Sequence, residues 1–236
     1  MPGGDARSVE GSRPGSRDER GPFAVVSPNT AIAEADRVDA VVFDVGRVLY
    51  QWDLAHLLRK VEPDEAQLAK VLSSVITEDW HFQHDRGRPL AGMVAERIAE
   101  YPEFEAHLQA YATRFNETIP APMPGSIELV EQLHRAGVPL FAITNFGAEF
   151  WAGFRPTASV FDLFRQIVVS GEELVAKPDP AIFVLAADRF GFPPGRMLFV
   201  DDNDDNIAAA HRLGWQVHRF RDAASLADDF SARGLI

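Results

Sequence analysis

Residues 40–53 read AVVFDVGRVLYQWD, and this stretch places a carboxylate directly after an apolar run. The run begins at residue 38 and is mostly β-branched or aromatic, without a polar face. Such a run is typical of a strand that is buried on both faces of a parallel sheet. Asp44 ends the run, and Gly46 follows two places later. The stretch therefore predicts a buried strand that carries one acid to the edge of a sheet.

Further apolar runs follow along the chain, and helical patterns lie between them. The runs are 138–143 (VPLFAI), 166–169 (QIVV), 197–200 (MLFV) and, more weakly, 215–218 (WQVH). The helical patterns are 126–137, 179–191 and 205–214. Strands that alternate with helices predict crossover units and a parallel sheet, so we expect an α/β fold of three layers, α/β/α, with a Rossmann-like sheet. In such sheets, ligands bind beyond the carboxyl ends of the strands.

Residues 50–120 interrupt this alternation. They contain four segments with helical patterns and no strong strand, and the proline-rich segment IPAPMPG closes them at 119–125. We therefore expect an all-helical insert at 50–120, between the two parts of a core formed by 36–49 and 121–236. Residues 1–35 are rich in Gly, Pro, Ser and Arg, which predicts a disordered tail.

Composition narrows the possible partners. The 236 residues carry a formal charge of −12, which disfavours nucleic acid and anionic membranes, since both need clustered cations. The absence of cysteine excludes disulfides, thiolate metal sites and a cysteine nucleophile. No apolar run approaches the ~20 residues of a membrane span. We expect a cytoplasmic protein whose partner is a small molecule; the sequence leaves monomer and homodimer open.

Polar residues of particular types follow the predicted strands. They are Asp44 after the first, Thr144 and Asn145 after the second, Lys177 in the loop after the third, and Asp201 and Asp202 after the fourth. Each has an ordinary structural explanation when taken alone, such as a turn, a cap or a solvated loop. Together they supply a carboxylate nucleophile, hydroxyl and amide donors, a cation and paired acids for a hard metal ion. That set suits phosphoryl transfer through an acyl phosphate.

These motifs, in this order, resemble those of the haloacid dehalogenase (HAD) superfamily. FDVGRVL resembles its first motif, ITN at 143–145 its second, AKPDPAIF its third and FVDDNDDNI its fourth. The resemblance spans roughly residues 38–220. It implies the HAD-like α/β core, with residues 50–120 as a helical cap inserted after the first strand.

The resemblance also implies roles for the polar residues. Asp44 is expected to be the nucleophile, and Lys177 to bridge the nucleophile and the phosphate. Thr144 and Asn145 are expected to bind the transferring group. The expected Mg²⁺ ligands are Asp44, the backbone carbonyl of Gly46, Asp202 and, beside it, Asp201.

Gly46 departs from the pattern of most phosphatases of this superfamily, which carry a second Asp there as general acid and base. The D-x-G pattern and the stretch DWHFQHDRGR at 79–88 are similar to a branch that includes glucose 1-phosphate phosphatases. An anomeric phosphate has a comparatively good leaving group and needs less acid assistance. This stretch offers candidate proton donors or substrate clamps, with His84 and Arg86 as the expected substrate-binding pair; the other candidates are His81, Asp85 and Arg88. A solvated turn between helices is the alternative.

The sequence thus predicts a Mg²⁺-dependent phosphatase that hydrolyses a small phosphorylated metabolite, a sugar phosphate above all. Two alternatives stay open. The first is a 2-haloacid dehalogenase, which also lacks the second Asp but carries neutral residues where this chain has Asp201 and Asp202. The second is a catalytically silent HAD-fold binding protein, which Gly46 and Arg47 suggest but which has little use for an aligned Asp44 and Lys177.

Overall fold

The structure of the chain is a computed structural model that describes residues 37–236. The expected tail at 1–35 lies outside these residues. Among the described helices, none is long and apolar enough to cross a membrane.

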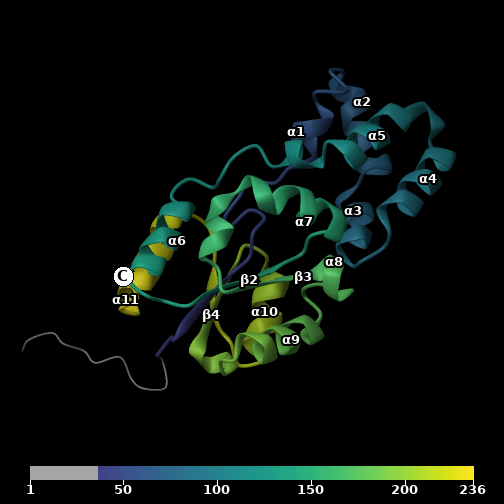
Figure 1. Cartoon of the computed structure of the whole chain (residues 1–236). Coiled ribbons are helices and arrows are strands. Elements are labelled where there is room, and N and C mark those ends of the chain that lie inside the picture. The colour runs from purple at the N-terminus through teal and green to yellow at the C-terminus, as the bar shows by residue number, and fades with distance from the viewer. Residues whose placement is uncertain (1–36) are drawn as a thin grey trace, which may run out of the picture. The chain divides into compact units, whose positions relative to one another are not determined.

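Five parallel strands form a single sheet at the centre of the described chain (Figure 1). They are β1 (Ala40–Phe43), β2 (Leu140–Thr144), β3 (Gln166–Val169), β4 (Met197–Asp201) and β5 (Gln216–Arg219). Their order across the sheet is β3-β2-β1-β4-β5, so β1 lies in the middle and pairs with β2 and β4. The predicted α/β class and the five predicted strands are confirmed.

Successive residues of the central strand point to opposite faces of the sheet and enter two separate cores. Val41 and Phe43 belong to one buried cluster, and Ala40 and Val42 belong to the other. All four side chains are fully buried, as expected for a strand that is covered on both faces. The apolar run that precedes Asp44 is thereby explained by burial on both sides.

Helices cover both faces of the sheet. α6 (Ser126–Arg135) and α11 (Ala223–Ala232) contribute to the first cluster, whereas α9 (Pro180–Phe190) and α10 (Asp204–Arg212) contribute to the second. The helices α7 (Ala148–Phe154) and α8 (Ser170–Glu173) follow β2 and β3 directly. The short turns η5 (Arg155–Thr157), η6 (Ser159–Leu163) and η7 (Pro194–Arg196) complete this part of the chain. The sequence patterns did not predict α7, α8 or α11.

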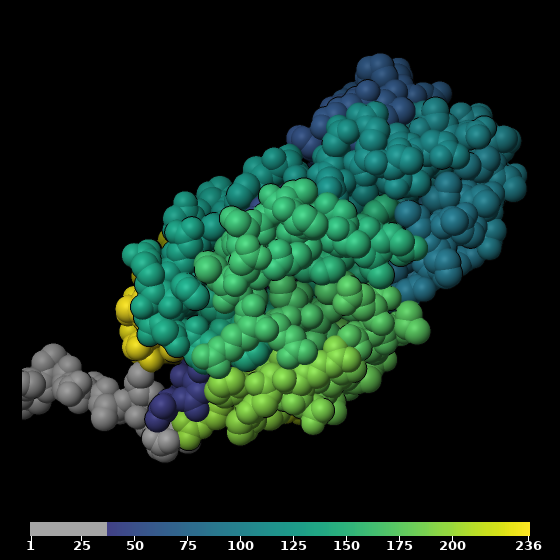
Figure 2. All heavy atoms as spheres, in the orientation of Figure 1, coloured from purple at the N-terminus to yellow at the C-terminus, as the bar shows by residue number. Residues whose placement is uncertain are grey.

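Residues 54–118 form short helices and contain no strand. These are α1 (Leu54–Leu58), α2 (Glu65–Lys70), the π-helical turn η2 (Val71–Val75), α3 (Glu78–Asp85), α4 (Leu90–Glu100), η3 (Pro102–Phe104), α5 (Glu105–Thr113) and η4 (Phe115–Thr118). We call residues 54–118 the helical segment. In Figure 2 its blue and teal surface adjoins the green surface of α7 and α8, and α3 contacts α8 while η4 contacts α7.

The two chain segments that connect the helical segment to the sheet run side by side. Leu49 accepts a backbone hydrogen bond from Met123, and Gln51 donates one to Ala121. A third, from Asp53 to Thr118, continues the pairing. These bonds hold the helical segment next to the carboxyl end of β1.

Candidate active site

The polar residues predicted from the strand ends meet at the carboxyl edge of the sheet. Asp44 directly follows β1, Asp201 is the last residue of β4, and Lys177 lies in the loop before α9. The ammonium of Lys177 lies 2.9 Å from Asp44 Oδ1 and 2.7 Å from Asp201 Oδ2. It also donates to the backbone carbonyl oxygen of Ile143 at 2.9 Å. With 1% of its surface exposed, Lys177 is fixed among these three acceptors.

Asp201 is held from several sides. Its Oδ2 accepts from Lys177, and both of its carboxylate oxygens lie 3.1 Å from the side-chain amide nitrogen of Asn206. The backbone amide of Asn203 donates to Oδ1 at 2.8 Å. A carboxylate with this many donors is fully buried without being unsatisfied. Asp201 therefore orients Lys177 toward Asp44.

Three carboxylates come close enough to share a metal ion. Asp44, Asp201 and Asp202 each offer an oxygen atom, and these atoms lie within 4.8 Å of one another. Lys177 supplies one positive charge to the group. Carboxylate oxygens are the ligands that Mg²⁺ prefers, so the donor set fits a hard divalent cation. Lys177 pairs with Asp44 and Asp201, whereas Asp202 has no ion pair with a lysine among the described residues.

The protonation of these acids reflects their crowding. The pKa of Asp44 is raised to about 7, because burial and the charges of Asp201 and Asp202 together outweigh the opposing charge of Lys177. Burial and the charge of Asp201 also raise the pKa of Asp202. For Lys177, burial lowers the pKa, but Asp201 and Asp44 raise it more and keep the ammonium charged. A bound cation would favour the ionised form of all three acids.

Of the two residues predicted to bind the transferring group, Asn145 lines the cavity described below and Thr144 does not. The side chain of Asn145 clamps the loop that carries Lys177: its Oδ1 accepts from the backbone amide of Lys177, and its Nδ2 donates to the Lys177 carbonyl, both at 2.9 Å. Thr144 is buried at the end of β2.

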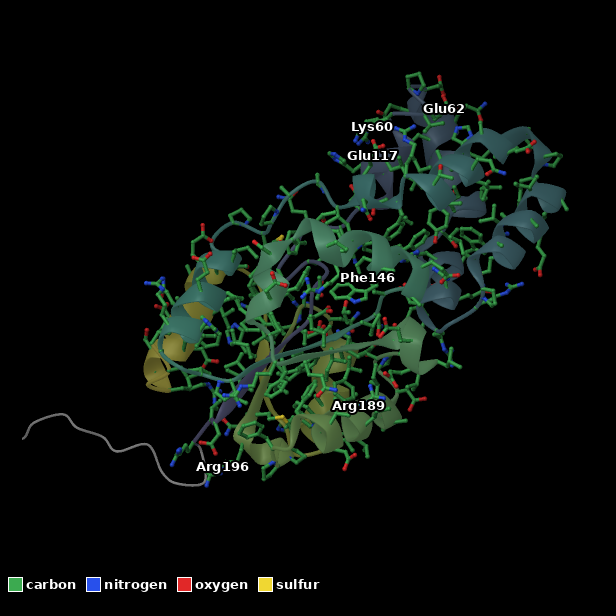
Figure 3. The ribbon with its side chains drawn as sticks, viewed as in Figure 1. Lys60, Glu62, Glu117, Phe146, Arg189 and Arg196 are labelled. Carbon is green, nitrogen blue, oxygen red and sulfur yellow. The ribbon has the colours of Figure 1, made fainter. Side chains whose placement is uncertain are left out.

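A cavity of about 280 Å³ opens over these residues. From the sheet edge it is lined by Asp44, Gly46, Asn145, Lys177 and Asp202, among others. From the helical segment and its connections it is lined by Trp52, Glu78, Asp79, His81, Phe82, Asp85 and Phe115. Phe146, labelled in Figure 3, belongs to the loop after β2 and also lines it. The cavity thus joins the predicted strand-end residues to the helical segment.

The loop after Asp44 contains Gly46 and Arg47. A β-carbon at position 46 would lie 4.0 Å from Cβ of Trp52, an ordinary contact, so space alone does not require glycine there. Arg47 adopts a left-handed backbone conformation with φ 59°. Its guanidinium stacks over Trp52 at 4.6 Å and pairs with Glu78 at 2.5 Å, which ties this loop to the start of α3.

The stretch DWHFQHDRGR is helix α3 and the turn after it, not a solvated turn alone. The structure does not bring His84 and Arg86 into the cavity. His84 Nδ1 lies 2.8 Å from the Arg88 carbonyl oxygen, and a β-carbon on Gly147 would collide with the His84 ring. Arg86 is exposed at the end of α3. The cavity-facing pair is instead His81 and Asp85, one helical turn apart.

Comparison with known proteins agrees with this architecture. A family model for haloacid dehalogenase-like hydrolases matches residues 38–214, and the chain therefore belongs to this family. It is a hydrolase of the HAD superfamily, as the strand-end motifs predicted.

Particular relatives can be named. A glyceraldehyde 3-phosphate phosphatase of Methanopyrus kandleri is 30% identical over 202 residues, which cover 78% of this chain and 84% of the relative. A phosphoglycolate phosphatase of Pectobacterium atrosepticum is 32% identical over 87 residues, 37% of each protein. The crystal structure of a HAD family enzyme from Bacteroides thetaiotaomicron superposes with a TM-score of 0.65 at 19% identity, covering 82% of this chain and 98% of that one. The same enzyme is also known in complex with magnesium and inorganic phosphate, with a TM-score of 0.62 at 19% identity, covering 78% of this chain and 95% of that one.

Proposed function

We propose that this protein is a Mg²⁺-dependent phosphatase that hydrolyses a small phosphorylated metabolite, with sugar phosphates as the substrate class. One observation carries the proposal: the buried ammonium of Lys177 lies 2.9 Å from Asp44 Oδ1, beside the two further carboxylates of Asp201 and Asp202. A cation at that distance holds a carboxylate in place and can also offset the charge of an incoming phosphate. The phosphatase names among the relatives agree with this choice.

In the proposed reaction, an oxygen of Asp44 attacks phosphorus and the P–O bond to the leaving group breaks. The product of this step is an aspartyl phosphate, which water then hydrolyses to regenerate Asp44 and release inorganic phosphate. Lys177 stabilises the phosphoryl oxygens, and Asn145 keeps the Lys177 loop in position. Asp44, Asp202 and the Gly46 carbonyl would hold Mg²⁺, with Asp201 beside them; the ion supplies charge neutralisation for the transferring group.

Residues 50–120 are proposed to act as a cap that excludes water and selects the leaving group, with 36–49 and 121–236 as the catalytic core. The cavity is lined from both parts, and its helical side contributes aromatic rings at Trp52, Phe82 and Phe115. Aromatic faces suit the apolar faces of a sugar or another compact ring. His84, Arg86 and Thr144 do not line the cavity, so we assign substrate contacts to Asn145 and to the residues that do.

The dehalogenase alternative fits the charges less well. A halocarboxylate is itself an anion, and it would meet three clustered carboxylates with a single ammonium to offset them. Without a further cation, that arrangement repels the substrate. A catalytically silent binding protein has no need for the contact between Asp44 and Lys177, and burying these two charged groups costs free energy.

The test measures phosphate release from a panel of sugar and other metabolite phosphates, with Mg²⁺ and with EDTA, in the wild type and in Asp44→Asn. The proposal expects release that needs the metal and that Asp44→Asn abolishes while the variant keeps its thermal unfolding curve. Release that survives in Asp44→Asn would overturn Asp44 as nucleophile. No release with any phosphate, followed by halide release from 2-chloropropionate, would establish the dehalogenase instead.

A further inference from the structure

Phosphate ester cleavage leaves an alkoxide that needs a proton, and the position of Gly46 offers no side chain to supply one. The cavity contains another acid, Asp85, at the last turn of α3. Asp85 is 5% exposed and lines the cavity, and its Oδ1 is buried without a hydrogen-bond partner among the described residues. Buried polar atoms are nearly always satisfied, so an unpartnered carboxylate oxygen on a residue that lines a cavity indicates a position for a ligand or a proton.

The other oxygen of Asp85 is part of a chain of polar groups. His81 Nε2 lies 3.3 Å from Asp85 Oδ2, and His81 Nδ1 lies 2.8 Å from the hydroxyl of Tyr111 in α5. When Asp85 is a carboxylate, one tautomer of His81 satisfies all three groups: Nε2 carries the hydrogen and donates to Asp85, and the Tyr111 hydroxyl donates to Nδ1. The chain leaves Oδ1 as the oxygen that can carry a transferable proton.

The imidazole of His81 is held rigidly in this chain. Its ring stacks on Trp52 at 5.1 Å and on Phe115 at 5.3 Å. Burial, with a smaller contribution from the nearby His84, lowers the pKa of His81 to about 3, so the ring is neutral at neutral pH. The burial of Tyr111 raises its pKa well above the usual value, so its hydroxyl keeps its proton. His81 and Tyr111 are therefore positioning residues for Asp85.

The backbone of Asp85 is anchored as well. Its carbonyl oxygen accepts from the Ser170 hydroxyl at 2.5 Å, and the same hydroxyl accepts from the backbone amide of Phe146 at 2.9 Å. Ser170 thereby joins the end of α3 to the loop that follows Asn145. The side chain and the backbone of Asp85 are both fixed relative to the strand ends.

The surroundings of Asp85 keep a proton on it near neutral pH. The pKa of Asp85 is raised to about 7, chiefly by burial; the charge of Asp44 adds to the rise, and the backbone amide of Gly147 and the charge of Lys177 oppose it. These groups and the neutral His81 are the polar neighbours that face it from the sheet edge and from its own helix, and Tyr111 faces it from α5 through its hydroxyl. An acid with such a pKa can both donate and accept a proton at neutral pH.

We infer that Asp85 is the general acid and base of the reaction, in the role that the missing side chain at position 46 would otherwise fill; this inference rests on the proposed phosphatase function. In the first step, Asp44 attacks phosphorus, the P–O bond to the leaving group breaks, and the leaving oxygen takes the proton from Asp85 Oδ1. In the second step, the Asp85 carboxylate takes a proton from the attacking water as the bond between Asp44 and phosphorus breaks. One water is consumed, and an alcohol and inorganic phosphate are released.

Other acids of the cavity wall fit this role less well. Glu78 is largely exposed and is paired with Arg47. Asp79 also lines the cavity, but it lies in the first turn of α3, where acids stabilise the helix dipole. Asp85 is the acid of α3 that is buried.

The test compares two substrates in the wild type, Asp85→Asn and Tyr111→Phe. The first is the alkyl phosphate that the wild type hydrolyses fastest in the metabolite panel. The second is p-nitrophenyl phosphate, whose leaving group departs without a proton at neutral pH. For Asp85→Asn, kcat/KM should fall about 100-fold or more with the alkyl phosphate and about fivefold or less with p-nitrophenyl phosphate.

Two further readouts separate catalysis from structure. In Asp85→Asn, p-nitrophenyl phosphate should give a burst of p-nitrophenol, because the aspartyl phosphate forms normally but its hydrolysis lacks the base. Tyr111→Phe keeps the ring and removes the hydroxyl, so it should lower kcat/KM for the alkyl phosphate by a smaller factor and leave p-nitrophenyl phosphate unaffected. This second variant also keeps the test valid if Asp85→Asn does not fold.

The outcomes are distinguishable. If kcat/KM falls equally for both substrates in both variants, the inference is overturned and Asp85 has a structural role instead. An unchanged kcat/KM for the alkyl phosphate in Asp85→Asn would show that no acid at this position is needed, and would also overturn it. In both cases the proposed function would stand, since the wild type would still release phosphate; a wild type without release from either substrate would overturn both proposals.

Discussion

Lys177 Nζ lies 2.9 Å from Asp44 Oδ1, and both side chains are buried at the centre of the sheet edge. The pair brings together two distant parts of the sequence, and it is completed by the contact of the same ammonium with Asp201 at 2.7 Å. One cation between two carboxylates leaves an excess of negative charge. That imbalance connects the stability of the site to its proposed metal ion, and it makes Lys177 and Asp202 informative positions for mutation.

Replacing Lys177 with Met should destabilise the fold strongly. The substitution removes the charge but keeps a long apolar side chain, so Asp44 and Asp201 lose their buried partner. Breaking a buried pair in this way costs about 3–5 kcal/mol. Urea denaturation of the wild type and of Lys177→Met measures the difference in the free energy of unfolding.

A surface pair gives the matched control for that prediction. Lys60 lies 2.8 Å from Glu117, and Figure 3 labels both residues in the helical segment. Both side chains are solvated, so Lys60→Met should leave the free energy of unfolding unchanged within error. If the two lysine variants are equally stable, the Lys177 contacts do not contribute as argued.

Mg²⁺ should stabilise the protein against heat through Asp202. A ligand that binds the folded state raises the melting temperature in proportion to its binding free energy. We expect Mg²⁺ to raise the Tm of the wild type, EDTA to reverse the effect, and Asp202→Asn to abolish it. Asp204→Asn is the control from the same acidic run. Asp204 forms an ion pair with Arg219 at 2.7 Å and does not belong to the three clustered carboxylates. A Tm that responds to Mg²⁺ equally in both variants would contradict Asp202 as a ligand.

The strand-end residues could be predicted from the sequence because their positions follow from topology. Asp44, Lys177 and Asp201 come after apolar runs or in the loops between elements, and parallel strands bring such positions to one edge. The face of α3 could not be predicted in the same way. Its sequence, EDWHFQHD, places polar groups all around the helix, so no apolar stripe shows which side turns inward. The prediction therefore chose His84 and Arg86, whereas tertiary packing turns His81 and Asp85 toward the cavity.

The missed helices have a related explanation. α7 and α8 are short, begin within a few residues of a strand and have no capping side chain, so they carry little local signal. The aromatic residues of α7, Phe150, Trp151 and Phe154, are buried. Ser170 could not be assigned from the sequence, because its two hydrogen bonds join residues that lie 24 and 85 positions away.

Removing the Ser170 hydroxyl should loosen the end of α3. In Ser170→Ala, the backbone amide of Phe146 and the carbonyl of Asp85 lose their buried partner. Leaving such groups unsatisfied costs about 1–3 kcal/mol. Hydrogen exchange should show faster exchange at Phe146 and the last turn of α3, with the sheet unchanged. Ser225→Ala removes an exposed hydroxyl at the start of α11 and serves as the control; similar exchange at α3 in both variants would contradict the anchoring role.

Asp85 should make the stability of the protein depend on pH. Its pKa is raised from 3.8 to about 7 by burial, so the folded state binds a proton that the unfolded state has lost. Stability from this group is fully present below pH 3.8 and is lost as the pH rises through about 7. Asp85→Asn removes the titration. The free energy of unfolding of the variant relative to the wild type should therefore increase by a few kcal/mol between about pH 4 and about pH 8.

That difference is measured by urea denaturation of both proteins across the pH range, without metal. Titration of Asp44 affects the wild type and the variant alike, so it largely cancels in the comparison. A difference that stays constant with pH would show that Asp85 titrates normally in the folded protein. It would also remove the electrostatic support for Asp85 as a proton donor.

The charges of the cavity wall should select against a second negative group on the substrate. Away from the strand ends, the wall carries Glu78 and Asp79 besides Asp85, which keeps its proton near neutral pH, whereas its one described cation, Arg47, already pairs with Glu78. A carboxylate on the leaving group would meet Glu78 and Asp79 at a cost of about 1–2 kcal/mol, which corresponds to about 5- to 30-fold in kcat/KM. Glucose 1-phosphate and glyceraldehyde 3-phosphate should therefore be better substrates than phosphoglycolate. Glu78→Gln frees Arg47 and removes one acid, so it should narrow the gap; a wild type that prefers phosphoglycolate would contradict this assignment of the wall.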